Sequence, residues 1–193
     1  MKLKALFTLA TVATLSVAFK LTESSTWTVD KSHAKLGFTV SHLMVSDVEG
    51  WFKTFDANIT ATNEDFSDAV VEMTADVATI NTEDENRDKH LKTADFFDVP
   101  KFPTLTFKSS SFKKVDALNY KVKGNLTMHG ITKPIELNAT AKIGTNPMSK
   151  KTIAGFKITG LINRNDFGLG VAIPGAIVGE DVSIVANVEF VKK

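Results

Sequence analysis

Eight stretches of this sequence alternate apolar and polar residues with a period of two. In the first of them Ala34, Leu36, Phe38 and Val40 share one face. This period is typical of β-strands, because successive side chains point to opposite faces of a sheet. Strands with one apolar and one polar face form antiparallel sheets that are covered on one side only. The stretches span residues 34–41, 51–60, 71–77, 105–109, 120–128, 135–143, 156–160 and 182–190.

Eight such strands can close into a barrel or fold as a sandwich. The interior of an eight-stranded barrel is either filled by side chains or holds one small ligand. Strands of about nine residues are roughly 30 Å long, so a cavity between them would suit a linear ligand. An outer-membrane barrel shows the same alternation, but one Tyr and two Trp cannot form two aromatic girdles.

One segment departs from the strand pattern. Thr82 and Glu85 have the spacing of a capping box, in which the Thr82 hydroxyl accepts from the backbone N–H of Glu85. We therefore predict a helix from Glu83 to about Lys92, and a second short helical turn over residues 93–98. The connection from Gly130 to Pro134 predicts a hairpin between two strong strands.

The N-terminal residues have the three parts of a secretory signal. Lys2 and Lys4 precede an apolar stretch over residues 5–17, which is shorter than the about 20 residues of a membrane span. Small residues follow, ending at Ala18, where a signal peptidase would cut. We predict a signal peptide over residues 1–18, one domain over residues 19–193 and no stable membrane span.

The amino-acid composition excludes several classes of function. There are 23 Lys and Arg against 22 Asp and Glu, so no basic excess is available to neutralise phosphates, and we predict no nucleic-acid partner. The absence of Cys excludes disulfides, thiolate metal sites and Cys nucleophiles. Fourteen Phe against one Tyr and two Trp favour an apolar lining, because Phe brings no hydrogen-bonding group.

Few residues offer chemistry of their own. The histidines have no metal-ligand spacing, so a hydrolase or metal-dependent enzyme would need His33, His42 and His129 assembled in three dimensions. Arg87 and Arg164 are the only two arginines, and each lies beside a helical or loop feature. Three alternatives stay open: a ligand carrier, such an enzyme, and an interaction module whose barrel is filled.

Several ordered motifs resemble the YceI-like polyisoprenoid-binding family, from about Trp27 to Phe190. One departure is Ala34, where the family often has Ser. The motifs that carry the resemblance are Trp27-Thr28-Val29-Asp30 with Ser32-His33, Val40-Ser41-His42-Leu43, Val48-Glu49-Gly50-Trp51-Phe52, Asn86-Arg87-Asp88-Lys89-His90-Leu91, Asp95-Phe96-Phe97-Asp98, Gly124 to Pro134 and Arg164-Asn165-Asp166-Phe167-Gly168-Leu169.

The resemblance implies an all-β fold: an extended eight-stranded antiparallel, lipocalin-like β-barrel with one or two short helices, located in the periplasm. It implies binding and sequestration or transport of an isoprenoid lipid, of quinone or polyprenyl type, with no catalysis, cofactor or metal. A homodimer is compatible with it. For the polar mouth we predict Arg87, His90 and Arg164. For the apolar ligand contacts we predict Phe38, Val40, Phe55, Phe107, Leu126, Met128, Phe156 and Phe167.

Overall fold

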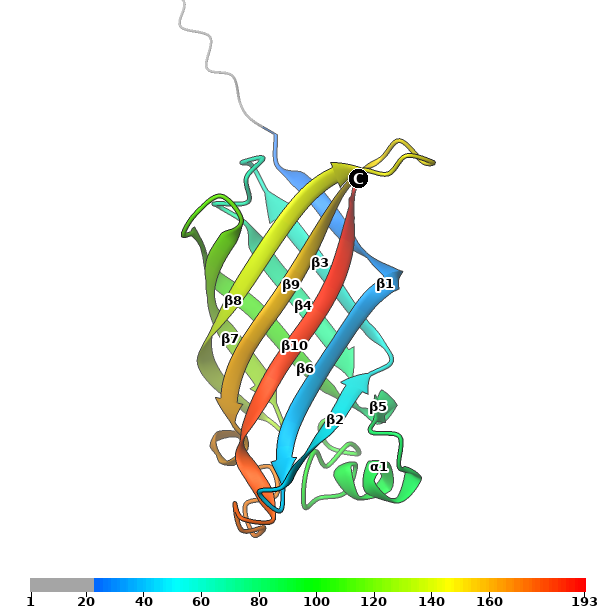
Figure 1. Ribbon diagram of the computed structural model, residues 1–193, viewed down its shortest axis with the longest axis vertical. Helices are drawn as coiled ribbons and strands as arrows, with labels where there is room; N and C mark the ends of the chain where they lie inside the picture. The colour runs from blue at the N-terminus through cyan, green and yellow to red at the C-terminus, as the bar shows by residue number, and fades with distance from the viewer. Residues whose placement is uncertain (1–22) are drawn as a thin grey trace, which may run out of the picture.

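The computed structural model describes residues 23–193, whose strands form one antiparallel sheet that closes on itself (Figure 1). The predicted signal peptide lies outside the described residues. The sheet order is β10-β9-β8-β7-β6-β4-β3-β1-β2-β5, and pairing of β10 with β1 closes the barrel. The strands are β1 (Ser25–His42), β2 (Ser46–Phe52), β3 (Phe55–Ala61), β4 (Val70–Asp76), β5 (Ile80–Asn81), β6 (Thr104–Lys114), β7 (Asn119–Met128), β8 (Ile131–Thr145), β9 (Thr152–Asn163) and β10 (Val178–Lys192).

The predicted eight-stranded barrel is confirmed, although the chain forms ten strand segments. Both β2 and β3 pair with β1, the first along residues 36–42 and the second along residues 25–28. They therefore share one position in the barrel wall, as do β4 and the two-residue β5. Among the described residues, no helix is long and apolar enough to cross a membrane.

The break between β2 and β3 corrects one predicted face. The alternation placed Trp51 on the same face as Phe55, with Phe52 opposite. In the structure Phe52 is buried inside the barrel, whereas the Trp51 ring lies under the Lys35 ammonium, 4.3 Å from it. The bend at Lys53 interrupts the period, so the face that points inward changes there.

The predicted hairpin is present and tighter than the sequence suggested. Met128 pairs with Ile131, so only His129 and Gly130 form the turn, and Pro134 already belongs to β8. Both turn residues have positive φ, 51° and 74°, as a type I′ turn requires. A Cβ on Gly130 would come within 2.6 Å of the Phe102 ring, so close packing as well as φ favours glycine.

The helical segment is shorter than predicted and has a different cap. Helix α1 covers Glu85–Leu91, and its N-cap is Asp84, whose carboxylate accepts from the backbone N–H groups of Asn86 and Arg87. The Thr82 hydroxyl is already bonded to Asp88 and Arg87, so it cannot cap the helix. Residues 93–98 form hydrogen-bonded turns and no second helix. Two short 3₁₀ helices complete the described fold: η1 (Val77–Thr79) and η2 (Arg164–Phe167).

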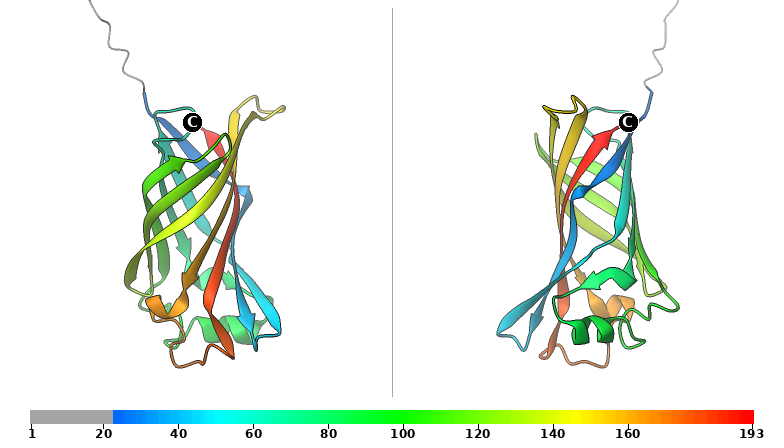
Figure 2. Two further views of the ribbon diagram at one scale, coloured as in Figure 1. Left: turned by 60° about the vertical axis from the view of Figure 1, so that its left-hand side comes forward. Right: turned by 90° about the vertical axis from the view of Figure 1, so that its right-hand side faces the viewer.

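The loops gather into two distinct ends. Helix α1, the β1–β2 turn and the loop between η2 and β10 lie together at the end opposite the C-terminus (Figure 2). The β3–β4, β6–β7 and β8–β9 loops lie at the C-terminal end (Figure 1). We call these the mouth end and the closed end.

Candidate functional site: an apolar cavity with one polar end

The inward faces of the strands surround a cavity of about 470 Å³. Its walls are almost entirely aliphatic and aromatic, because alternation sends one side chain in two to the inside. Several inward residues keep partial exposure although they point away from bulk solvent, among them Leu36, Phe38 and Ile184. Their exposed surface faces the hollow, so the barrel interior is not filled by its own side chains.

The structure brings most of the predicted site residues together around this cavity. Arg87, His90 and Arg164 lie at its mouth end, and Phe167 is not among the lining residues. Phe167 is 1% exposed and is the last residue of η2, and its backbone carbonyl contacts His129 Nδ1 at 3.0 Å. The predicted apolar positions that line the cavity are Phe38, Val40, Phe55, Phe107, Leu126, Met128 and Phe156.

An aromatic plug fills the closed end. It consists of Trp27, Phe66, Phe112, Tyr120, Phe156 and Phe190, all buried. Phe66 lies at its centre, 5.1 Å from the Trp27 ring and 5.2 Å from the Phe156 ring. Phe156, Phe112 and Phe190 also form the cavity wall, so the plug sets the inner limit of the hollow.

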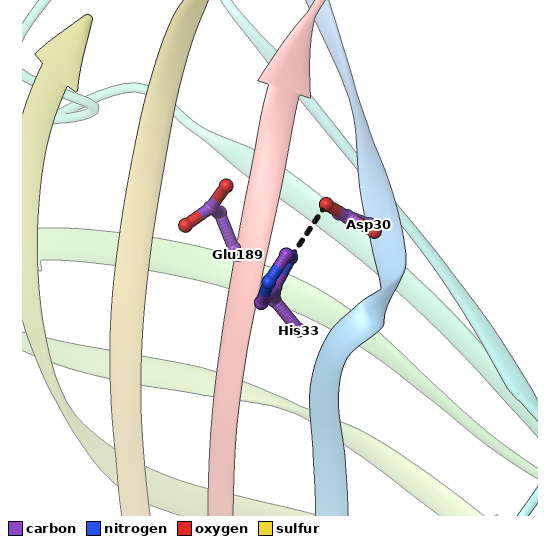
Figure 3. A group of neighbouring side chains, drawn as sticks. All are labelled: Asp30, His33 and Glu189. Carbon is purple, nitrogen blue, oxygen red and sulfur yellow. Dashed lines mark hydrogen bonds and ion pairs between the residues drawn. The ribbon is translucent and has the colours of Figure 1, made fainter. Parts of the chain in front are cut away.

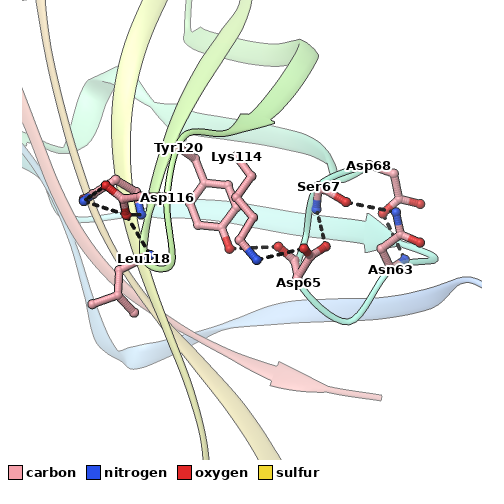
Figure 4. A network of polar contacts seen from close by, with 9 residues as sticks. Asn63, Asp65, Ser67, Asp68, Lys114, Asp116, Leu118 and Tyr120 are labelled. Atoms are coloured by element: carbon pink, nitrogen blue, oxygen red, sulfur yellow. Dashed lines mark hydrogen bonds and ion pairs between the residues drawn. The ribbon is translucent and has the colours of Figure 1, made fainter.

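Polar contacts of the β3–β4 loop hold the plug in place (Figure 4). Tyr120 donates its hydroxyl proton to the Asp65 carbonyl at 2.8 Å, and Lys114 pairs with the Asp65 carboxylate at 2.8 Å. The Asp68 carboxylate accepts from the backbone N–H groups of Thr62 and Asn63. Phe66 has a φ of 58°, uncommon for a bulky residue, and these contacts on both sides of it fix that conformation.

The Lys114 ammonium stabilises the charged form of Asp65 most, followed by hydrogen bonds from Ser67. Together they lower the Asp65 pKa to about 2. Burial raises the pKa of the Tyr120 hydroxyl, so Tyr120 stays a neutral donor. The closed end is therefore both packed and hydrogen-bonded.

The mouth end is organised differently. Arg87, His90 and Ile177 are the only exposed residues among the side chains that line the cavity in the described chain, which locates the opening beside α1 and the loop before β10. Arg87 donates to the Thr82 hydroxyl and carbonyl at 2.8 and 2.7 Å, and Thr82 in turn donates to Asp88. The guanidinium is thus held at the opening, close to where a polar ligand group would lie.

Arg164 is buried and plays another role. It is 3% exposed, and its guanidinium donates to the Asn165 side chain and to the carbonyls of Leu169, Gly170, Ile173, Val178 and Gly179. Those carbonyls belong to the loop between η2 and β10 and to the first two residues of β10, so one planar cation holds both ends of this loop. None of these acceptors is a carboxylate, and the positive charge remains beside the cavity.

The histidines considered as catalytic or metal-binding residues lie in three different settings. His42 lines the mouth end of the cavity. His129 lies in the β7–β8 turn, where its ring packs edge-on against Phe102. His33 lies on a bulge of β1, where Val29 pairs with Phe190 but Ala34 pairs with Val188. The fold does not bring the three together.

Asp30, His33 and Glu189 form the one group in residues 23–193 with ligand atoms close enough to hold a metal ion, all within 4.8 Å (Figure 3). None of the three lines the cavity. His33 Nδ1 already contacts Asp30 at 2.9 Å, which raises the His33 pKa, while Ser32 and His33 lower the Asp30 pKa to about 2. The protonation states therefore favour an ion pair that fastens the bulge of β1.

Sequence reasoning missed several residues that shape the site. Leu36, Leu105 and Ile158 share faces with predicted contacts, so their position on the strand was the available signal. Phe66 gave a weaker signal, as a single Phe in a loop of Asn, Asp and Ser. Thr82, the acceptor that positions Arg87, had no signal of its own beyond its capping pattern.

Comparison with known proteins agrees with this architecture. The YceI-like domain profile matches residues 27–190. The UPF0312 protein SA2479 of Staphylococcus aureus (strain N315) is 37% identical over 172 residues, covering 85% of this chain and 96% of the relative.

Solved structures are similar as well. Burkholderia cenocepacia BcnA superposes with a TM-score of 0.74 at 25% identity, over 83% of this chain and 98% of that one. A Campylobacter jejuni YceI protein gives a TM-score of 0.72 at 31% identity, over 79% and 90%. A polyisoprenoid binding domain from Saccharophagus degradans shares the fold, with a TM-score of 0.62 at 14% identity, over 86% and 98%. The chain, with its eight-stranded barrel and matching profile, belongs to the family of YceI-like domain proteins.

Proposed function

We propose that the protein binds a long isoprenoid lipid in its barrel, with the chain in the apolar cavity and the polar end at Arg87 and His90. The observation that carries the proposal is a hollow with apolar walls that is closed by aromatic rings at one end and opens beside polar groups at the other. This polarity matches an amphiphile with one apolar tail. Burial of the tail would supply affinity at about 0.8 kcal/mol per CH₂ group.

The relatives support the chemical class. One protein of the same fold is described as a polyisoprenoid binding domain. A branched, unsaturated chain has no hydrogen-bonding groups, and a wall rich in Phe, Leu, Ile and Val asks for none. The role we propose is sequestration or transport of a quinone or polyprenyl lipid without catalysis. It would take place in the periplasm after removal of residues 1–18.

A matched pair of variants on β9 tests the cavity. Ile158 points into the hollow, whereas its neighbour Lys157 is exposed on the outer face. Ile158→Trp should fill the space and abolish binding, and Lys157→Trp should leave it unchanged. Protein purified without detergent is extracted with organic solvent for mass spectrometry, and ubiquinone is added to measure the shift in Tm.

Wild type and Lys157→Trp should yield an isoprenoid or show the shift in Tm, and Ile158→Trp should do neither. Absence of both signals in folded wild-type protein would overturn the proposal. Equal binding by the two variants would place the ligand outside the cavity.

A further inference from the structure

Two turns at the mouth end expose five apolar side chains, as the closed-end loops expose Val115, Leu118 and Met148, but only the mouth-end group borders the cavity. The exposed fractions are 50% for Leu43, 76% for Met44, 83% for Val45, 64% for Val171 and 45% for Ile177. We call these five residues the aliphatic rim. Exposed apolar groups that gather in one place mark interaction sites, whereas single ones need no explanation.

The two turns of the rim are joined to each other. The backbone N–H of Leu43 donates to the carbonyl of Ile177 at 2.9 Å. Leu43 and Met44 have φ values of 53° and 58°, a conformation that L-residues adopt only when their surroundings hold it. The second turn belongs to the loop that the Arg164 guanidinium holds. The rim is therefore a defined surface and not a pair of independent loops.

The rim is continuous with the cavity. Ile177 belongs to both, since it is exposed and also lines the hollow. His42 and Val178, which flank the two turns along the chain, line the hollow too. A ligand that enters between α1 and these turns passes directly from the aliphatic rim onto the cavity wall.

Size and residue type indicate what covers the rim. A stable protein interface buries about 800 Å² on each partner and is enriched in aromatic residues and Arg at its centre. Met is enriched there too, but Met44 is the only rim residue of these types, and the other four are Leu, Val and Ile from two short turns. Small aliphatic protrusions of this kind suit shallow insertion among lipid chains, where affinity scales with apolar area and needs no complementary partner shape.

The charged residues around the rim indicate which kind of lipid headgroup the surface carries. No Lys or Arg occurs in residues 36–52 or 165–191, which contain both turns. Five carboxylates in these stretches are exposed: Asp47, Glu49, Asp166, Glu180 and Asp181. Residues 83–92, which include α1 at the same end (Figure 2), hold four carboxylates (Glu83, Asp84, Glu85 and Asp88) against three basic side chains (Arg87, Lys89 and Lys92), so they do not reverse the sign. Anionic headgroups would be repelled by this arrangement, whereas a zwitterionic surface would not.

We propose that the aliphatic rim inserts into a zwitterionic lipid surface, with the cavity mouth turned toward the acyl chains. An apolar ligand would then enter the barrel without crossing water. The purpose of this docking rests on the proposed function, but the insertion itself is measurable without any ligand.

The test compares variants at the two ends of the barrel. Met44→Asp/Val45→Asp places charges in the rim, and Asp tolerates the positive φ of residue 44. Met148, 90% exposed in the β8–β9 loop at the closed end, provides the matched control Met148→Asp. Each protein is expressed for export, its intact mass is measured to establish the state of residues 1–18, and its Tm is checked.

Partition onto phosphatidylcholine vesicles is measured by flotation. The rim variant should partition about tenfold more weakly than wild type, and Met148→Asp should equal wild type. Adding phosphatidylserine should weaken wild-type partition, and added salt should reverse that effect. No partition of wild type, or equal loss in Met148→Asp, would overturn the docking proposal. A concentration-dependent dimer that the rim mutations abolish would also overturn it, because a second copy would then cover the rim.

A second readout separates docking from ligand binding. Uptake of ubiquinone from vesicles should slow about tenfold in the rim variant, in line with its weaker partition, while the Tm shift with ubiquinone added in ethanol stays unchanged. If wild type binds vesicles but neither takes up ubiquinone by either route nor yields an isoprenoid on extraction, the proposed function fails and the docking proposal stands. If uptake from vesicles is the same in both proteins, insertion of the rim does not deliver the ligand.

Discussion

The two ends of the barrel are built from the same strands, but one end is tightly packed and the other is open. At the closed end Phe66 is 1% exposed, and loop hydrogen bonds fasten the aromatic plug around it. At the mouth end inward residues such as Phe38 keep free surface, and the cavity opens beside the exposed Arg87 and Ile177. The open cavity gives up burial at one end, and close packing at the other end of the same barrel supplies the stability.

The largest contrast should come from removing one ring at each end. Phe66→Ala leaves a hole among packed rings and should lower the free energy of unfolding by about 3–5 kcal/mol. Phe38→Ala enlarges a space that is already open, so it should cost less, about 1–2 kcal/mol, because fewer contacts are lost. Urea unfolding followed by tryptophan fluorescence measures both. Equal losses would show that the two ends do not differ in packing.

The two arginines give the next contrast, within the mouth end itself. Arg164→Met removes the donor for five backbone carbonyls and should destabilise the protein by about 2–4 kcal/mol, because those buried and half-buried acceptors lose their partners. Arg87→Met removes an exposed group whose two hydrogen bonds end on buried Thr82, so it should cost less, about 1 kcal/mol, while weakening the binding of a polar-headed lipid.

The same urea titrations measure the cost of each arginine substitution, with Arg164→Lys as a further comparison. Lys keeps the charge but lacks the planar fork, so it should restore little of the lost stability. Full rescue by Lys would show that the charge matters and the hydrogen-bond geometry does not.

The smallest effect concerns acid stability at the closed end. The Asp65 pKa is about 2 in the folded protein against an ordinary value of 3.8, so its pairing with Lys114 stabilises the fold fully above about pH 4. This contribution is lost as the pH falls from about 4 toward 2, where the folded carboxylate takes up its proton. Asp65→Asn should lower the urea midpoint at pH 6 and leave it closer to wild type at pH 2.

Asp56→Asn is a suitable control for this comparison. Asp56 also pairs with a lysine, Lys31 at 3.0 Å, but both side chains are well exposed on the outer surface of the barrel. If the urea midpoint depends on pH in the same way in the two variants, Asp65 contributes no more to acid stability than an exposed surface pair does.

Much of the architecture was predictable because alternation has a physical cause that acts locally. A residue on an apolar face must point inward whatever its partner strand, so Phe107 and Leu126 could be placed at the cavity wall from their positions alone. The prediction was wrong at Trp51 and Phe52, where a bend of two residues reverses the faces without any change in composition.

Short sequence motifs that fit two different structures were poorer predictors of side-chain contacts. Thr82 has the spacing of a helix cap, but its hydroxyl is occupied by Asp88 and Arg87, so Asp84 caps α1 instead. The sequence placed Arg164 at a polar mouth, yet its burial depends on a loop that folds around it from 15 residues away. Competition among partners that are distant along the chain decides such cases, and no short pattern records it.

The sequence by itself determined the class of fold, the inward faces of most strands and the short hairpin turn, because these follow from side-chain period and backbone preference. Only the tertiary structure decided that the barrel is hollow rather than filled, and which end is closed. Those properties depend on how far Phe66 reaches into the barrel and on how the mouth loops are tied back. Both are set by packing between segments that are far apart in the chain.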